Sequence, residues 1–551
     1  MSELKPKLFS VIKHYTLNQF YNDVIAGIIV AIIALPLSIA LAISSGVSPE
    51  QGIHTAIIAG FFVSLLGGSR VQIGGPTGAF MVIVFGIVQK YGLDGLIIST
   101  IMAGIFLIIM GVLRLGSFIK FIPYPITTGF TSGIALVIFT TQLKDFFGFK
   151  IENVPADFIG KTTSYIHNFN TFNIQSIIVG LISLVIIILW PRVNKKIPGS
   201  LIAIIAATVL VVVFKLDVET IGSKFGELSS ALPVPKLPAL SIGRIEELIQ
   251  PAFTIAILGA IESLLSAVVA DGIIGSKHKS NMELIAQGVG NIASGLFGGI
   301  PATGAIARTA ANIKNGGRTP VAGMVHSVVL LLIMILFMQY AKMVPLTALA
   351  AVLMVVAYNM CEWRSFAALF KAPKSDIAVL LTTFALTVAV DLVVAIEVGL
   401  VIACVLFMKR MSDVTEVSDI TLDFAEDYDD DAVEGQLLSM GEDVFVYEVN
   451  GPMFFGAADK FMQVIDEVED AAKVLILSMK NVPSMDATAH RALERLYRDC
   501  KKNHTKLILS GVQEQPYTVL KKAGFLSKIG EDSLCPNCQE AMDFANLATE
   551  P

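Results

Sequence analysis

Long apolar runs are the feature that most restricts how this chain can fold. They recur from about Tyr21 to Phe407, and each is about 20 residues long, which is the length that a helix needs to cross a bilayer. The 551 residues are 54% hydrophobic and only 16% charged, a balance that excludes a fully soluble protein. Residues 411–551 have the composition of ordinary globular sequence. The sequence therefore predicts a membrane domain followed by a soluble one.

Gly, Pro and charge clusters divide the apolar runs into about fourteen candidate spans. Their expected starts are Asn22, Gln51, Gly75, Leu93, Phe121, Phe172, Gly199, Leu248, Met282, Thr303, Pro320, Pro345, Ser375 and Leu392. The third and tenth spans are too short for a complete crossing. If residues 1–20 are cytoplasmic, this number of crossings places most loop Lys and Arg inside, as the positive-inside rule requires. We therefore expect both ends of the chain to be cytoplasmic.

Two motifs rich in glycine mark an internal repeat. Residues 74–79 (GGPTGA) in the first half match residues 298–305 (GGIPATGA) in the second half, and each copy opens a short span. The copies are seven spans apart, and because this number is odd they enter the membrane from opposite sides. The sequence thus predicts an inverted-topology repeat, as in many secondary transporters.

Interrupted spans at membrane depth are candidate binding sites, because unpaired backbone groups cannot face lipid. The helices after Pro76 and Pro301 would point their partially positive N-termini at one midplane point, which suits a carboxylate or another oxyanion. The expected donors are backbone N–H groups and threonine hydroxyls of Thr77, Gly78, Ala79, Thr303, Gly304 and Ala305. Close helix packing is the alternative role for the glycines. Phe80 either lines the site or packs in the core.

Charged residues within spans are costly and mark functional sites, and Glu262 and Arg308 are the clearest examples. Burial favours the protonated form of a carboxylate, so Glu262 is expected to exchange a proton near neutral pH. Ser266, one turn later, would help to form a cation or substrate site. Arg308 would attract the anion, and a structural ion pair with Glu262 is the alternative for both charges.

Other classes of function find no support in the sequence. The net charge of −6 comes without a basic stripe for nucleic acid. Walker A, dinucleotide, metal-triad and nucleophile-elbow motifs are missing, so we expect no ATP-driven pump, enzyme, cofactor or metal site. Five cysteines form no secreted disulfide framework, which favours a reducing compartment. Cys535 and Cys538 form a lone CxxC, without the second pair of ligands that a structural zinc needs.

The sequence after residue 410 begins with an acidic stretch, residues 411–441, which we interpret as a linker. Short apolar strands then alternate with helical patterns, which predicts a small cytoplasmic α/β domain over residues 442–551. The expected strands are residues 444–449, 474–478 and 506–510, and the expected helices are residues 457–469 and 486–502.

These segments together resemble the SulP family of secondary anion transporters, also called solute carrier family 26. The likeness covers nearly the whole chain, and the residues that carry it are 23–27, 34–40, 74–80, 130–133, 259–271 and 301–317. The tail is similar to a STAS domain, the usual cytoplasmic appendage of this family. The resemblance implies an all-α polytopic membrane domain over residues 21–410, built of fourteen spans in two inverted halves of seven.

The family resemblance also implies a mechanism. Spans 1–4 and 8–11 would form a core domain that carries the site, and spans 5–7 and 12–14 a gate domain that faces the partner in a homodimer. Substrate would bind between the third and tenth spans, and the core would move like an elevator. In sodium-coupled bicarbonate members an Asp matches Glu262 and a Thr matches Ser266, so the Glu here favours H⁺ over Na⁺ as the coupling ion.

Within the family, three segments are most similar to the bacterial C4-dicarboxylate branch: residues 258–269, 275–279 and 305–312. Members of that branch take up succinate, fumarate and aspartate with protons. The sulfate branch usually has Pro-Gln early in the first span, whereas this chain has Pro36-Leu37. We therefore expect proton-coupled dicarboxylate uptake across a bacterial inner membrane. Sulfate or bicarbonate uptake, coupled to protons or sodium, is one alternative, and an anion channel or voltage-responsive motor is another.

The STAS-like domain departs from anti-sigma-factor antagonists at their phosphorylation site. Those proteins have Asp-Ser-Ser where this chain reads Asp486-Ala487-Thr488, so Ala487 stands at the position of the phosphorylated serine. We interpret the domain as a regulatory module whose partner is a cytoplasmic protein or the second subunit. A sensor that reports anion occupancy through this domain is a further alternative.

Overall fold

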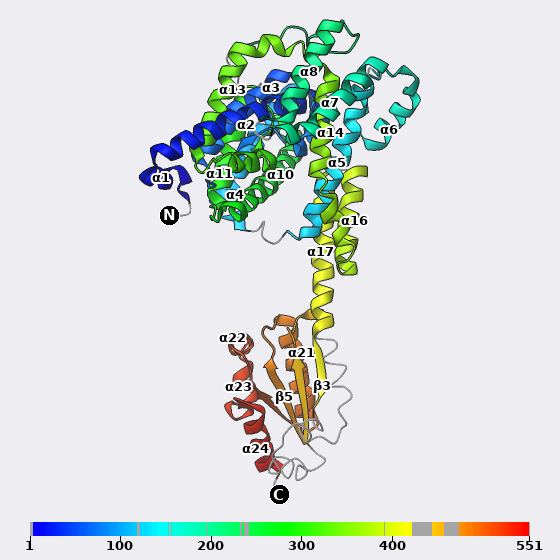
Figure 1. Cartoon of the computed structure of the whole chain (residues 1–551). Coiled ribbons are helices and arrows are strands. Elements are labelled where there is room, and N and C mark those ends of the chain that lie inside the picture. The colour runs from blue at the N-terminus through cyan, green and yellow to red at the C-terminus, as the bar shows by residue number, and fades with distance from the viewer. Residues whose placement is uncertain are drawn as a thin grey trace. The chain divides into compact units, whose positions relative to one another are not determined.

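The computed structural model describes residues 4–117, 122–151, 154–155, 157–194, 197–231, 234–235, 242–390, 392–420, 444–456 and 473–549. The chain divides into two compact units, Met1–Leu400 and Val401–Pro551. The first unit is mostly helical, and the second is a sheet with helices (Figure 1). The predicted fold class, a helical membrane domain and a small α/β domain, is confirmed.

Every predicted span corresponds to a helix or to half of one. The helices are α2 (Leu17–Ser44), α3 (Pro49–Leu66), α4 (Gly78–Val112), α5 (Tyr124–Phe147), α7 (Ile174–Val193), α8 (Gly199–Phe214), α10 (Ile242–Ile274), α11 (Ser280–Leu296), α12 (Ile306–Lys314), α13 (Pro320–Ala341), α14 (Leu346–Met360), α16 (Lys374–Ala389) and α17 (Leu392–Val414). Within the described ranges, seven helices are long and apolar enough to cross a bilayer. Short helices α1 (Lys7–Val11), α6 (Phe158–His167), α9 (Ile221–Phe225) and α15 (Trp363–Leu369) lie between or before the spans.

Helix α4 contains both the third and the fourth predicted spans. Gly92 interrupts its helical backbone with φ of 71° and ψ of −174°. Glycine adopts a positive φ without the steric cost that a Cβ would bring. The boundary predicted at Leu93 therefore corresponds to a turn between the two helical segments of α4.

Packing sorts the helices of the first unit into two groups. Helices α2, α3, α4, α10, α11, α12 and α13 pack against one another, and α5, α7, α8, α14 and α16 form the second group (Figure 1). The first group holds spans 1–4 and 8–11, as expected of the core, and the second holds gate spans. Helix α2 of the first half packs on α13 of the second half, and α10 of the second half packs on α4 of the first. Such reciprocal packing between the halves is what an inverted repeat predicts.

Two glycines allow the close approach of α4 and α11 within the core group. A Cβ added at Gly104 would lie 2.6 Å from the carbonyl oxygen of Gly288, and one added at Gly288 would lie 2.5 Å from that of Gly104. Small residues at such crossings let helix backbones meet in the absence of a hydrophobic driving force between helices. Part of the glycine content therefore serves packing.

The second unit is a five-stranded sheet in the order β3-β4-β5-β6-β7, flanked by helices (Figure 1). Its strands are β3 (Glu416–Asp419), β4 (Val444–Asn450), β5 (Val474–Asn481), β6 (Lys506–Ser510) and β7 (Leu534–Cys535), and its helices are α21 (Ala487–Lys502), α22 (Glu514–Lys522), α23 (Phe525–Ile529) and α24 (Cys538–Thr549). Strand β3 is antiparallel to β4, and the other pairs are parallel. The three predicted strands and the helix at 486–502 are present, whereas the helix expected at 457–469 lies outside the described residues.

The acidic segment expected as a linker is partly structured at its start. Helix α17 continues to Val414, and β3 follows as an edge strand paired to β4 in the register Glu416↔Asn450. Charged side chains are well tolerated on edge strands, because they face water and discourage further pairing. The acidic composition therefore concealed a strand. Residues 421–441 lie outside the described part of the chain.

Candidate functional site

The two glycine motifs of the repeat meet in the core group of helices. Strands β1 (Gly74–Gly75) and β2 (Thr303–Gly304) pair antiparallel in the register Gly74↔Gly304 and Gly75↔Thr303. Helix α4 begins three residues after β1, and α12 begins two residues after β2. The two half-helices therefore start from one shared strand pair, and this pairing was not predicted from the sequence.

Open helix N-termini supply the backbone donors of this site. Neither Thr77, the N-cap of α4, nor Ala305, the N-cap of α12, accepts a side-chain capping bond from its own helix. The first N–H groups of each helix lack intrahelical acceptors and carry partial positive charge. The N–H of Ala305 donates to the carbonyl of Ile73 at 2.9 Å, so on this side the free donors begin at Ile306 rather than at Ala305.

Helix α10 binds both motifs through threonine hydroxyls. The Thr77 hydroxyl donates to Oε2 of Glu262 at 2.8 Å, and the Thr303 hydroxyl donates to the carbonyl of Gly259 at 3.1 Å. Glu262 lies in the middle of α10 and is only 8% exposed. Both threonine hydroxyls are therefore hydrogen-bonded to α10, and the Glu262 carboxylate lies at the start of the first half-helix.

Arg308 extends from the first turn of α12 to the first motif. Its Nη2 donates to the carbonyl of Pro76, and its buried Nη1 has no hydrogen-bond partner in the described residues. A Cβ added at Gly75 would lie 2.5 Å from Nη1, and Gly75 has φ of 147°, so glycine is required there. The ion pairs of the described residues do not include one between Arg308 and Glu262. Nη1 therefore remains as a buried cationic donor.

The remaining predicted residues take positions around this centre. Gly78 is half-buried and Gly304 is buried. Phe80 is 1% exposed and faces Gly259, so it packs against α10. Ser266, 1% exposed, donates to the Thr309 hydroxyl at 3.4 Å. Ser266 of α10 therefore contacts α12.

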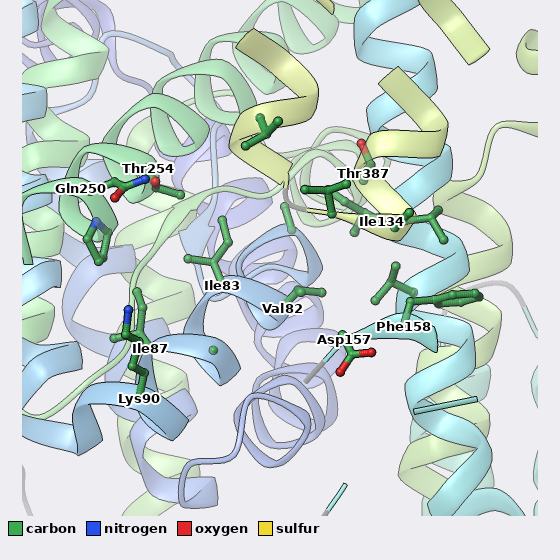
Figure 2. Close-up of a pocket in the computed structure, with 18 of the residues that line it drawn as sticks. Val82, Ile83, Ile87, Lys90, Ile134, Asp157, Phe158, Gln250, Thr254 and Thr387 are labelled. Atoms are coloured by element: carbon green, nitrogen blue, oxygen red, sulfur yellow. The ribbon is translucent and has the colours of Figure 1, made fainter. Parts of the chain in front are cut away.

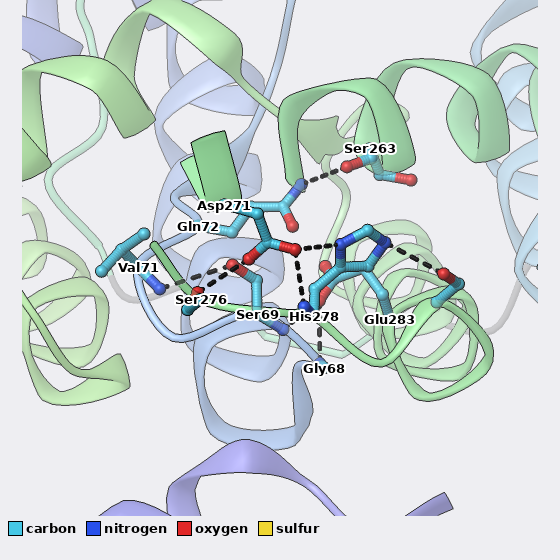
Figure 3. A network of polar contacts seen from close by, with 10 residues as sticks. Gly68, Ser69, Val71, Gln72, Ser263, Asp271, Ser276, His278 and Glu283 are labelled. Carbon is cyan, nitrogen blue, oxygen red and sulfur yellow. Dashed lines mark hydrogen bonds and ion pairs between the residues drawn. The ribbon is translucent and has the colours of Figure 1, made fainter. Parts of the chain in front are cut away.

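Gln72 is a polar residue of the site that sequence reasoning missed. Its Nε2 donates to the carbonyl of Ser263 at 2.9 Å, one residue after Glu262, and its Oε1 is buried without a partner in the described chain (Figure 3). A Cβ at Gly304 would overlap the Gln72 amide. The signal was available, because Gln72 is a lone amide just before the first glycine motif.

A buried carboxylate from α11 holds the loop that leads into the first motif. Glu283 is fully buried, and its Oε2 accepts the N–H groups of Gly68 at 2.8 Å and Ser69 at 2.9 Å (Figure 3). In the last turn of α10, Asp271 accepts a hydrogen bond from Nδ1 of His278 at 2.7 Å. The two bonds to Glu283 hold the segment that precedes Gln72 and the first glycine motif.

A cavity of about 470 Å³ borders the first half-helix. Ala79 lies at the motif, and Lys90 lies near the far end of the first segment of α4. Figure 2 shows Gln250 and Thr254 of α10 on one side, with Phe158 and Thr387 of α6 and α16 on the other. The cavity therefore lies between the core and gate groups and leads to the predicted site.

The start of α21 in the second unit carries the position of the anti-sigma-factor serine. Asp486 caps this helix, and its Oδ1 accepts the N–H groups of Thr488 and Ala489 at 2.9 and 2.8 Å. Ala487 and Thr488 are exposed. An exposed helix N-terminus can bind a partner through its free N–H groups, but Ala487 has no hydroxyl there that could be phosphorylated.

The CxxC cysteines of the second unit are free thiols. Burial raises the pKa of both Cys535 and Cys538 above the ordinary value. Protonated thiols are poor nucleophiles and poor metal ligands. In the described part of the chain no three His, Cys, Asp or Glu side chains gather closely enough to hold a metal ion.

A helical membrane domain of two inverted halves, with interrupted helices meeting at a buried site, defines the class of secondary transporters. The pattern of the sulfate permease family matches residues 20–383, and that of the STAS domain matches residues 440–541. The chain therefore belongs to the sulfate permease family of anion transporters, the family called SulP above.

Known proteins resemble the chain over nearly its whole length. It is 44% identical to the putative sulfate transporter YvdB of Bacillus subtilis, over 94% of this chain and 96% of the relative. It is 31% identical to the bicarbonate transporter BicA of Picosynechococcus, over 96% of this chain and 95% of the relative. The inward-facing structure of murine Slc26a9 shares the fold, with a TM-score of 0.86 and 20% identity over 99% of this chain and 94% of that one. These names give no support to the expected C4-dicarboxylate branch.

Proposed function

We propose that this chain is a secondary active transporter of a small inorganic oxyanion, with Glu262 as the site of proton exchange. The observation that carries the proposal is the strand pair β1–β2, from which two open helix N-termini begin beside a buried arginine. Helix N-termini and a guanidinium are donors that suit an anion, and Nη1 of Arg308 has no protein partner among the described residues.

The substrate class follows from relatives and from the chemistry of the site together. The relatives named above are called sulfate and bicarbonate transporters, which favours an inorganic oxyanion over the dicarboxylate expected from segments such as residues 305–312. A single buried arginine with backbone donors suits one compact anionic group. A C4-dicarboxylate, which has two separated carboxylates, is the competing substrate in the experiment below.

Proton coupling is proposed from the contact between Glu262 and Thr77. Protonated Glu262 can donate a hydrogen bond to the Thr77 hydroxyl, whereas ionised Glu262 can only accept one, which is the direction of the bond from Thr77 to Oε2. Thr77 is at the start of the half-helix, so the charge of Glu262 would change the electrostatic potential where the anion would bind. Na⁺ is the alternative coupling ion, with Ser266 as a neighbouring oxygen ligand.

The proposed transport cycle moves the core group of helices against the gate group. The cavity between them gives the anion a path to Ala79 in one position of the core. An elevator-like displacement would open the site to the opposite side. We propose that the protein works as a homodimer in a bacterial inner membrane, with residues 1–20 and the STAS domain in the cytoplasm, where the domain regulates transport or contacts a partner.

Uptake into proteoliposomes tests the substrate class. Radiolabelled sulfate, bicarbonate and succinate are offered separately under an inward proton gradient, with empty liposomes as the background. The proposal predicts gradient-driven accumulation of sulfate or bicarbonate and no accumulation of succinate. Accumulation of succinate, blocked by fumarate, would overturn the inorganic oxyanion and restore the dicarboxylate. Accumulation that a sodium gradient drives and a proton gradient does not would overturn proton coupling.

A further inference from the structure

A second, smaller cavity of about 110 Å³ lies where α2 and α5 end and α4 and α6 begin, and no residue of the glycine motifs lines it. Its lining includes three lysines, Lys144 of α5, Lys161 of α6 and Lys224 of α9. Among the described residues of the lining, Asp145 is the only carboxylate. Three ammonium groups of this described lining therefore face one carboxylate, in a space with room for an anion of a few heavy atoms.

Lys161 is the least compensated of the three lysines. It is 4% exposed, and its Nζ donates to the Thr141 hydroxyl at 3.0 Å and lies 5.7 Å from the ring centroid of Phe85. The ion pairs of the described residues do not include one to Lys161. A buried ammonium has three donors, and a single neutral hydroxyl leaves most of its charge and its donor capacity unused.

The other two lysines are only partly neutralised. Nζ of Lys224 lies 3.8 Å from Oδ1 of Asp145, which is a loose ion pair. Nζ of Lys144 donates to the carbonyl of Ile151 at 2.6 Å, and this neutral acceptor leaves the charge in place. Burial of like charges around one cavity is unfavourable unless a counter-charge enters it.

We propose that the cavity among Lys144, Lys161 and Lys224 binds a small inorganic anion, such as chloride, bicarbonate or sulfate. The anion would add negative charge to that of Asp145. Its oxygens, or the halide itself, would accept hydrogen bonds from the N–H groups of the lysines that have no other acceptor. The site is distinct from the strand pair β1–β2, because the two share no residue.

The position of this site gives it a role in transport, and that role rests on the proposed function, whereas anion binding itself does not. Val82 lines both this cavity and the larger one that leads to Ala79. Phe158 of α6 and its N-cap Asp157 line the larger cavity, and Lys161 of the same helix lines the smaller one. The positive charge of the lysines therefore lies beside the approach to the central site, where it raises the local anion concentration.

Equilibrium binding to the purified full-length protein in detergent tests the proposal. Binding of radiolabelled sulfate is measured by scintillation proximity, with unlabelled chloride and bicarbonate as competitors, in an Arg308→Gln background that disables the central site. We expect one saturable site in this background, competed by the smaller anions. Adding Lys161→Gln should weaken that binding at least tenfold, whereas Lys150→Gln, at an exposed lysine between α5 and α6, should leave it unchanged.

Two results would overturn the proposal: unaltered binding in the Lys161→Gln protein, or no saturable site left once Arg308 is replaced. Size-exclusion chromatography reports whether Lys161→Gln folds, and Lys224→Gln, on a less buried lysine, gives a second variant that should also weaken binding. A wrong assignment of the central site would give a different result. Arg308→Gln would then transport at the wild-type rate, and Lys161→Gln would still weaken binding.

Discussion

At the scale of single residues, the two membrane-buried charges are connected through two consecutive residues and not through each other. Arg308 donates to the carbonyl of Pro76, and Glu262 accepts from the hydroxyl of Thr77. A change of protonation at Glu262 therefore acts on the residue next to the anchor of Arg308. This adjacency gives a short physical route by which proton binding and anion binding affect each other.

Replacement of Arg308 tests its role as the anion-attracting group. Arg308→Gln should lower the initial uptake rate by at least about tenfold, because a buried charge partner of the anion is lost. Arg308→Lys should restore part of the rate, since it keeps the charge without the planar fork. Lys314→Gln, an exposed lysine on the last turn of α12, is the matched control. Wild-type uptake by Arg308→Gln would contradict this role.

The lysine cavity gives a pH prediction with a defined sign. Burial lowers the pKa of Lys161 to about 8, so its charge is present below that pH and lost above it. The other titratable groups at this cavity and beside Lys161 are Lys144, Asp145, Asp157, Tyr165 and Lys224. Sulfate binding in the Arg308→Gln background should weaken as pH rises from 7 to 9, and the added Lys161→Gln should flatten this dependence. An equal fall with pH in both proteins would assign the titration to another group.

At the scale of elements, the sequence predicted where the helices begin, but it did not predict that the two glycine motifs pair as strands. Apolar length and glycine spacing locate α4 and α12, because these patterns are local along the chain. The pairing of β1 with β2 joins residues more than two hundred positions apart, and no local pattern encodes it. That pairing consumes the Ala305 N–H and places Gln72 against Gly304, so the donor set differs from the expected one.

Helix packing in the core yields a stability prediction with a control on the same helix. Gly104→Ala on α4 would place its Cβ against the Gly288 carbonyl and should cost about 1–3 kcal/mol, seen as a lower melting temperature in detergent. At Gly86, also on α4, a Cβ meets nothing within 4 Å, so Gly86→Ala should melt no lower than the wild type. Equal melting temperatures for the two variants would contradict the close packing of α4 on α11.

At the scale of the whole molecule, the chain is two compact units with separate cores. Strand β3 pairs with β4, so the soluble unit includes residues that the composition assigned to a linker. The sequence could not reveal this, because the four residues of β3 include two acidic side chains and a single apolar one, which is too little apolar pattern to identify a strand. A deletion meant to remove the soluble unit cleanly should therefore begin at Thr415 rather than at Glu442.

Removal of residues 415–551 separates a regulatory role from a transport role for the STAS domain. Domains with their own cores can fold alone, so the truncated protein should keep its uptake rate per molecule within about threefold. Uptake is measured in proteoliposomes with protein content determined by quantitative gel. Loss of uptake by a truncated protein that remains monodisperse would show that the domain is needed for transport itself.

The most direct test of the central claim, that Glu262 couples proton movement to anion movement at the paired half-helices, is substrate-driven acidification. Proteoliposomes are loaded with a pH-sensitive dye, and the transported oxyanion is added outside without a proton gradient. The wild type should acidify the lumen, and Glu262→Gln should not, although it still exchanges labelled for unlabelled anion. Unchanged acidification in Glu262→Gln would contradict the account, and so would anion uptake by the wild type without any proton movement.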